Sequence, residues 1–367
     1  MRYLRNLGLD AYLLTYENEI SHFTPENDTW DYEKWKPYII PTKVVNGGLK
    51  HYFSYSRKHL LRELGGYDYY VANGFAPALF RKAGLTVDLF LPYCIGIEYT
   101  YFYNKSKFKQ SFAEIIFKFY QLKGLKNNVK LVGTIDKESL EKAKKYDLKT
   151  VNLAMPMVFV EQNADHDNEL LAVIEKIKKY DLVVFSHVSH FQNDTYGFSV
   201  KRNDIGIRGF ANFILRSGSK ASILVLLDYG PGVEQSKKLI EDLGIEDNVL
   251  WLPKMDRKRL MSIIAHIDIG FGEFGGHMWG GTVWEFMASG KPFFQFVNLN
   301  NEEIAKLLNA PGPTFFNTSD ENEISTILED IPINREKYIN IGNELKNWFN
   351  TNNGMGLAYQ YKQIISG

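Results

Sequence analysis

Short apolar runs alternate with amphipathic segments along most of the chain. Apolar runs bounded by turn residues are typical of strands that are buried on both faces. In the first half we expect strands at residues 11–15, 68–71, 87–91, 131–134 and 150–153. In the second half we expect strands at residues 181–185, 222–227, 248–252, 267–271 and 293–297. This alternation predicts an α/β fold, with mainly parallel sheets covered by helices on both faces.

Segments with a helical repeat of apolar positions lie between these runs. They predict helices at residues 49–64, 77–83, 137–146, 167–180, 205–217, 233–243, 257–265, 282–288, 335–349 and 353–365. Residues 21–42 are polar and aromatic, and we expect irregular structure there. The polar stretch 161–169 indicates a linker. We therefore expect one domain over residues 1–165, a second over 166–340, and a helical segment over 341–367 that packs back on the first.

Composition and charge narrow the class of protein. Among the 367 residues, 43 Lys and Arg balance 43 Asp and Glu, so the formal net charge is zero. This argues against a nucleic-acid binder, which would show a basic excess. The one cysteine, Cys94, excludes an internal disulfide and a cysteine zinc cluster, and no HExxH-type spacing suggests a metal. Without an apolar run that could span a bilayer or a signal-peptide cleavage site, we expect a cytoplasmic protein.

The strongest chemical signal is the stretch GGHMWGGTVWEFMASGKP at residues 275–292. Gly280 and Gly281 follow a predicted strand and precede a predicted helix. Glycine lets the backbone approach a ligand closely, and the N–H groups of a helix N-terminus favour an anion such as a diphosphate. Glu285 follows about one helical turn later, where a carboxylate can accept two ribose hydroxyls. The alternative is a tight turn followed by a solvated glutamate.

The segment EFMASGKP at 285–292 resembles the EAMACGKP signature of retaining GT-B-fold glycosyltransferases of the group 1 or family 4 type. The resemblance extends to VVFSHVSH at 183–190, KRNDIGIRGFANFI at 201–214, LLDYGPG at 226–232 and NVLWLPKMDRKRLMSIIAHIDIGF at 248–271. It implies two Rossmann-like domains facing each other across a cleft. It also implies transfer of a sugar from a nucleotide diphosphate sugar to an acceptor hydroxyl, with retention of configuration. Neither a metal nor a cofactor beyond the donor substrate is implied.

The resemblance assigns several residues to the diphosphate. The start of the predicted helix would present backbone N–H groups and one hydroxyl to the diphosphate and donor sugar, from Gly280, Gly281 and Thr282. Lys201 would neutralise the diphosphate as it leaves. Arg202 follows where the family has glycine, and would supply further positive charge. For Lys201 and Arg202 the alternative is that both are solvated charges at a helix start.

Other matched residues would contact the rest of the donor. Glu285 would bind the ribose hydroxyls, and the backbone at Lys254 and Met255 would read the base edge. His190 stands in place of the family's phosphate-binding arginine. His277 stands eight residues before Glu285, where the family's Glu–x7–Glu motif has its first glutamate. A histidine there can contact a sugar hydroxyl or a phosphate; the alternative is a turn histidine.

Two further positions near this stretch remain open. Glu273 lies four residues before His277 and is another candidate for the missing carboxylate. Trp279 and Trp284 either stack on a sugar or base, or belong to the core.

The N-terminal half resembles the same family loosely, through YDYYVANGFAPALFRKAG at 67–84. This implies that His22, Asn73 and Gly74 line the acceptor side of the cleft. Members of the family begin with a strand and a Gly-Gly loop before the first helix. Here the chain starts inside that helix, so we expect the N-terminal sheet to lack that strand.

Residues 99–130 combine seven lysines and one glutamate with many Tyr and Phe. Such a segment can lie on an anionic membrane surface, with aromatic rings at headgroup depth. We expect a peripheral enzyme on the inner membrane face, with a glycan or lipid-linked glycan as acceptor, in surface polysaccharide or lipopolysaccharide assembly. The alternative for the segment is a solvated helix with one core-facing aromatic stripe. Two other functions stay open: a degenerate, non-catalytic GT-B protein that binds nucleotide or a partner, and a GT-B epimerase or hydrolase.

Overall fold

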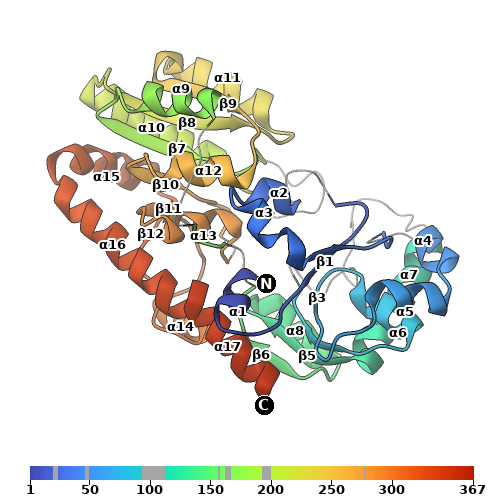
Figure 1. Cartoon of the computed structure of the whole chain (residues 1–367). Helices are drawn as coiled ribbons and strands as arrows, with labels where there is room; N and C mark the ends of the chain where they lie inside the picture. Colours follow the sequence, from blue (N-terminus) through green and yellow to red (C-terminus); the bar gives the residue numbers. More distant parts are fainter. Residues whose placement is uncertain are drawn as a thin grey trace.

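Each half of the chain is built on a parallel sheet covered by helices (Figure 1). The computed structural model describes residues 1–19, 24–45, 49–92, 112–155, 158–161, 167–191, 200–276 and 278–367. The C-terminal half holds six parallel strands in the order β12-β11-β10-β7-β8-β9. They are β7 (Leu182–Ser186), β8 (Ser222–Asp228), β9 (Val249–Pro253), β10 (Ile269–Phe271), β11 (Phe293–Gln295) and β12 (Phe316–Asn317).

This order is that of a doubly wound Rossmann sheet, in which β7 and β10 are neighbours at the point where the strand order reverses. Ligands of such sheets bind there, beyond the carboxyl ends of the strands. The side chains of successive residues of β7 are buried on opposite faces of the sheet: Val183 packs in one core cluster and Val184 in the other. The first cluster is covered by α9 (Asn168–Ile177), α12 (Arg257–Ile264) and α13 (Gly281–Ala288), and the second by α10 (Asn203–Ser217) and α15 (Glu321–Ile333).

The N-terminal half has a smaller sheet of four parallel strands in the order β3-β4-β5-β6. They are β3 (Val71–Ala72), β4 (Val87–Phe90), β5 (Val129–Thr134) and β6 (Thr150–Asn152). Their helices include α6 (Ala76–Ala83), α7 (Phe112–Asn128) and α8 (Lys137–Lys145). A Cβ added to Gly124 of α7 would come within 2.2 Å of the Pro77 oxygen, so this glycine allows the close packing of α7 on α6.

The region that the sequence predicts to be irregular contains regular structure instead. Strand β2 (Ile39–Pro41) lies in this region and pairs in parallel with β1 (Leu13–Thr15), the strand expected at 11–15, as a separate two-stranded sheet. Between them lie α2 (Pro25–Asp28), α3 (Tyr32–Trp35) and a 3-10 turn at Lys36–Tyr38. The expectation of irregular structure over 21–42 is therefore wrong for the described residues there. Elements of three or four residues are too short to show a periodic pattern of apolar positions in the sequence.

The helix expected at 49–64 is two helices, α4 (Leu49–Ser54) and α5 (Arg57–Leu64). The side chain of Ser56 accepts a hydrogen bond from the backbone N–H of His59, which caps α5 and starts a new helix.

The chain closes with two long helices, α16 (Arg335–Asn352) and α17 (Gly354–Ser366). Helix α17 lies beside α1 (Arg2–Asn6), so both ends of the chain are near each other (Figure 1). The hydroxyl of Tyr361 donates to the Ala154 oxygen at 2.9 Å, and Lys362 Nζ donates to the Leu7 oxygen at 3.0 Å. The last helix therefore joins the N-terminal half. No helix within the described ranges is long and apolar enough to cross a membrane.

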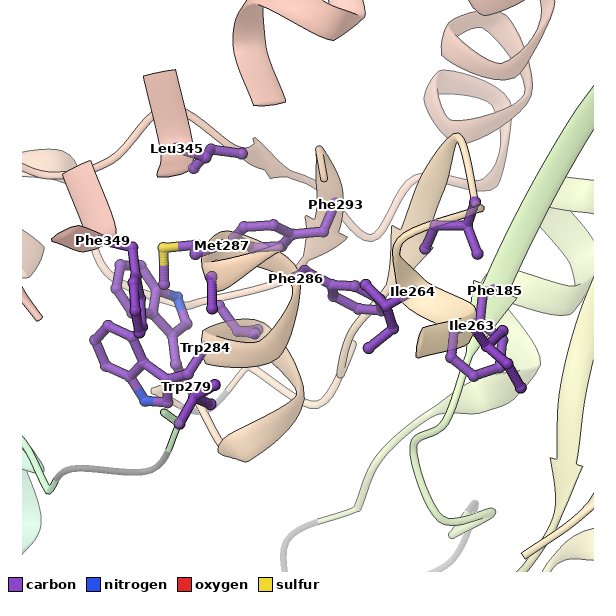
Figure 2. Packing of buried hydrophobic residues seen from close by; sticks show 14 of the residues in the cluster. Phe185, Ile263, Ile264, Trp279, Trp284, Phe286, Met287, Phe293, Leu345 and Phe349 are labelled. Atoms are coloured by element: carbon purple, nitrogen blue, oxygen red, sulfur yellow. The ribbon is translucent and has the colours of Figure 1, made fainter. Parts of the chain in front are cut away.

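Helix α13 is fixed by a dense aromatic core (Figure 2). Trp279 and Trp284 meet edge to face with ring centroids 5.3 Å apart, beside Phe349 of α16. Both tryptophans are buried, so they pack as core residues instead of facing a ligand. Their burial holds the N-terminus of α13 in place.

Candidate functional site

The start of α13 lies where the Rossmann sheet places its ligands, on the chain that leaves the carboxyl end of β10. Gly280 is the N-cap residue, and Gly281 and Thr282 begin the helix. Gly280 has no side chain with which to cap the first-turn N–H groups, so these groups can serve an external anion. The three residues predicted to face the diphosphate therefore form one helix N-terminus.

Lys201 and Glu273 form an ion pair at this helix start. Lys201 Nζ lies 2.5 Å from Glu273 Oε1, and the backbone N–H of Phe274 donates to the Lys201 oxygen at 2.9 Å. A Cβ on Gly280 would lie 3.0 Å from Glu273 Oε1. The side-chain amide oxygen of Gln295 accepts the Glu273 N–H at 2.6 Å, which fixes this carboxylate-bearing turn. Thus Lys201 and the N-terminus of α13 meet at one buried carboxylate.

Glu285 lies in the middle of α13 and is held by two side chains. His187 Nε2 donates to Glu285 Oε2 at 2.5 Å, since a carboxylate oxygen can only accept. Arg257 Nε donates to Glu285 Oε1 at 2.8 Å. The Glu285 side chain is 5% exposed. Burial acts to raise the pKa of Glu285, but the hydrogen bond and charge of His187 and the charge of Arg257 outweigh it, so the pKa lies below its usual value.

Arg257 also reaches the N-terminal half. Its Nη1 donates to Asp28 Oδ1 of α2 at 3.0 Å. Asp28 is paired in turn with Arg2, and Arg2 lies 3.7 Å from Glu161. A chain of alternating charges therefore runs from Glu285 across the boundary between the two halves.

His190 is fully buried away from this cluster of charges. Its Nδ1 lies 2.7 Å from the Ser236 hydroxyl of α11 (Val233–Leu243), and its backbone oxygen accepts from Gly232 N–H at 2.8 Å. A Cβ on Gly230 would lie 2.5 Å from the His190 nitrogen, and Gly230 has φ +110°, so only glycine fits that turn. Burial lowers the pKa of His190 to about 4. The imidazole is thus neutral, in contrast to the charged arginine that it replaces in the resemblance.

The side chains of Arg202 and Lys254 interact with residues of the same half other than Lys201 and Glu273. Arg202, at φ +53°, binds Asp204 through Nε and Nη2, both at 2.9 Å. The structure therefore does not bring it together with Lys201 at Glu273. Lys254 follows β9, and its Nζ lies 4.3 Å from the centre of the Tyr229 ring. Met255, next to it, is half-buried against the first core cluster.

Two predicted site residues, His277 and His22, lie outside the described residues. On the expected acceptor side, Asn73 and Gly74 follow β3, and the Gly74 oxygen accepts from Gln121 Nε2 at 2.8 Å. Among the residues that the structure describes, no group of three or more His, Cys, Asp or Glu side chains could hold a metal ion.

Sequence reasoning missed three residues that the structure places around Glu285: His187, Arg257 and Asp28. His187 lies inside the quoted stretch 183–190 and directly follows β7. Residues that follow a strand next to the reversal of strand order often face the ligand, so its position was a signal for His187. Arg257 and Asp28 carried no comparable signal.

Comparison with known proteins shows likeness in structure only. No protein-family model matches the chain, and no curated protein matches its sequence. WaaG, a glycosyltransferase involved in lipopolysaccharide biosynthesis, is similar in structure at 13% identity and a TM-score of 0.59. The alignment covers 100% of this chain and 94% of the WaaG chain. HepE of Anabaena, solved with UDP-glucose, is similar at 13% identity and a TM-score of 0.58, and the alignment covers 97% of this chain and 99% of the HepE chain.

TarM of S. aureus, solved with UDP and α-GlcNAc-glycerol, matches 81% of this chain at 13% identity and TM-score 0.52, and the chain spans 55% of TarM. At such low identities these likenesses show the fold. The parallel sheets of the two halves agree with it. The chain therefore has the GT-B fold, with two Rossmann-like α/β domains.

Proposed function

We propose that this chain is a glycosyltransferase that moves a sugar from a nucleotide diphosphate sugar to an acceptor hydroxyl. The observation that carries the proposal is the meeting of Lys201 with the N-terminus of α13. When the anomeric carbon–oxygen bond breaks, its electron pair leaves on the diphosphate. An ammonium group and unpaired helix N–H groups stabilise that charge. The acceptor oxygen forms the new bond, and its proton passes to the departing diphosphate.

In this proposal Glu285 and Glu273 bind different parts of the donor. Glu285 accepts the ribose hydroxyls, since it lies one helical turn from the diphosphate site. Glu273 accepts hydroxyls of the donor sugar, because its carboxylate borders both Lys201 and Gly280. The backbone at Lys254 and Met255 borders the base. Retention of configuration, independence from metal and membership of family 4 are proposed from the resemblance of residues 285–292.

A membrane-bound acceptor is proposed from one face of the N-terminal half. Phe119 and Ile115 of α7 and Phe53 of α4 are large apolar side chains that are more than half exposed. Lys123 Nζ lies 4.2 Å from the centre of the Phe119 ring. Exposed rings beside lysines suit an anionic bilayer surface, where a lipid-linked glycan of surface polysaccharide or lipopolysaccharide assembly would be met.

Co-sedimentation with vesicles tests this surface. We expect binding to vesicles that contain phosphatidylglycerol and little binding to phosphatidylcholine alone. Phe119→Ser should reduce the binding, while Tyr359→Ser, which changes an equally exposed ring of α17, should not. Equal binding by both variants would contradict a membrane role for α7.

A second function, a non-catalytic nucleotide-binding or partner protein, is favoured by one observation. Both oxygens of Glu285 are already hydrogen-bonded within the chain, and Arg202 is paired with Asp204. A site with its charges so paired could bind without turnover.

Product analysis decides between these functions. The chain is incubated with UDP-, GDP- and ADP-sugars, with and without a lipid-linked glycan fraction, and the released nucleotide and the sugars are identified. Nucleotide release that requires the acceptor supports transfer. Release with free sugar alone indicates a hydrolase, an altered donor sugar indicates an epimerase, and binding without turnover indicates the non-catalytic protein; each would overturn the proposal. Lys201→Ala should abolish release, while Lys220→Ala, at an exposed site on the same half, should not.

A further inference from the structure

One guanidinium joins the donor side of the C-terminal half to the N-terminal half. Arg257 stands at the first position of α12 and binds Glu285 through Nε at 2.8 Å and Asp28 through Nη1 at 3.0 Å. The planar fork of arginine presents separate N–H groups to the two carboxylates, whereas lysine has a single ammonium nitrogen. Asp28 and Arg257 are 229 positions apart in the sequence, so only the fold brings them into contact.

Neighbouring contacts hold α2 firmly against the start of α12. Lys258 Nζ donates to the backbone oxygen of Glu26 at 2.8 Å and lies 5.0 Å from the centre of the Trp30 ring. On the other side, Asp28 is anchored by Arg2 within its own half. The position of Arg257 therefore depends on how the two halves sit against each other.

Glu285 is closed to an incoming ligand in this arrangement. Its side chain is 5% exposed, and each of its oxygens accepts a hydrogen bond. His187 approaches from β7, inside the same half, whereas Arg257 approaches from the side of Asp28. A ribose that arrives between the two halves therefore meets Arg257 first.

We propose that Arg257 is a positioning residue that couples occupation of the donor site to the contact between the two halves. This inference rests on the proposed function. Ribose hydroxyls displace Arg257 from Glu285 Oε1, and the contact with Asp28 opposes that displacement. Since a ligand shifts an equilibrium toward the state that it binds better, loosening the Asp28 contact tightens nucleotide binding.

Calorimetry of the full chain with UDP, GDP and ADP tests the coupling. Asp28→Asn removes the charge that holds Arg257, and we expect at least about a fivefold gain in affinity for the nucleotide that binds, the low end of usual coupling. Glu26→Gln is the matched control, because it removes one negative charge from the same helix at an exposed side chain and leaves the backbone contact to Lys258. It should bind like the wild type.

Two further measurements guard against misfolding. Arg257→Lys keeps the charge but lacks the planar fork that reaches both carboxylates, so it should also bind more tightly than the wild type. Thermal melting should give one cooperative transition for Asp28→Asn and for Glu26→Gln, which shows that both variants are folded when their binding is measured.

The outcomes separate this inference from the proposed function. If the wild type binds a nucleotide but Asp28→Asn and Arg257→Lys bind it equally or more weakly, the coupling is overturned and the donor site stands. If no form of the chain binds a nucleotide, the donor site itself is wrong and the coupling falls with it.

Discussion

Replacing Glu273 with Gln separates binding from catalysis in the proposed site. Glu273 Oε1 lies 2.5 Å from Lys201 Nζ, at the point where the donor diphosphate would approach. The glutamine keeps the size of the side chain but removes its negative charge. Lys201 is then available to the diphosphate, and one repulsion is removed. We therefore expect Glu273→Gln to bind nucleoside diphosphate more tightly and yet to transfer sugar more slowly, because the carboxylate no longer accepts the sugar hydroxyls.

The size of the binding effect follows from Coulomb's law. Two negative groups that flank one ammonium lie about 5 Å apart, and at an effective dielectric constant of about 20 their repulsion is about 3 kcal/mol. Lys201 keeps 23% of its side chain exposed, so solvent and salt screen part of this repulsion. We expect a gain of about 1–2 kcal/mol, or about 5- to 30-fold in the dissociation constant.

Calorimetry gives the dissociation constant, and steady-state kinetics give kcat and KM for the nucleotide sugar. Glu241→Gln, at an exposed position of α11 in the same half, controls for the change in net charge and should leave all three values unchanged. Thermal melting checks that Glu273→Gln remains folded. Weaker binding of nucleoside diphosphate by Glu273→Gln, with the melting temperature unchanged, would refute the placement of the diphosphate at Lys201.

Two further predictions concern stability. His190 stays neutral in the folded chain down to about pH 4, whereas its imidazole in the unfolded chain gains a proton below pH 6.5, so stability should fall by about 1.4 kcal/mol per pH unit as the pH drops from 6.5 toward 4. Denaturant titrations should show this slope in the wild type and in His51→Gln, an exposed control, and a much smaller one in His190→Gln; equal slopes would contradict the burial of a neutral imidazole. Tyr361→Phe leaves the buried Ala154 oxygen without its donor and should cost about 1–2 kcal/mol, while Tyr359→Phe on the exposed side of α17 should cost almost nothing, and equal losses would contradict the docking of α17.

Five strands of the C-terminal half, β7 to β11, could be predicted from the sequence to within about two residues, the usual uncertainty of element ends, whereas the two-residue β12 was missed. Strand β8 (Ser222–Asp228) shows why, since the side chains of residues 222–227 are buried and its apolar run is continuous. The N-terminal half was harder to predict. The strand expected at 11–15 contains β1, but β2 was missed because it has three residues and is stabilised by pairing with β1, which is far away in the sequence.

Contacts between residues far apart in the sequence could not be predicted for the candidate site either. Gly280 and Glu285 lie in one short stretch, so their motif was visible in the sequence. The partners of Glu285 were not, because His187 is 98 positions away and Arg257 is 28 positions away. Lys201 and Glu273 were each singled out from the sequence, but only the fold brings their side chains into contact.

Calorimetric titration of the purified chain with UDP, GDP, ADP and CMP, with and without Mg²⁺, tests the donor site most directly. We predict that one nucleoside diphosphate binds whether or not the metal is present. Lys201→Ala should weaken this binding by at least about tenfold, because a charge-assisted hydrogen bond contributes about 1.5–3 kcal/mol. Lys220→Ala should have no effect. Failure of every nucleotide to bind, or equal binding by Lys201→Ala and the wild type, would contradict a donor site at Lys201 and the N-terminus of α13.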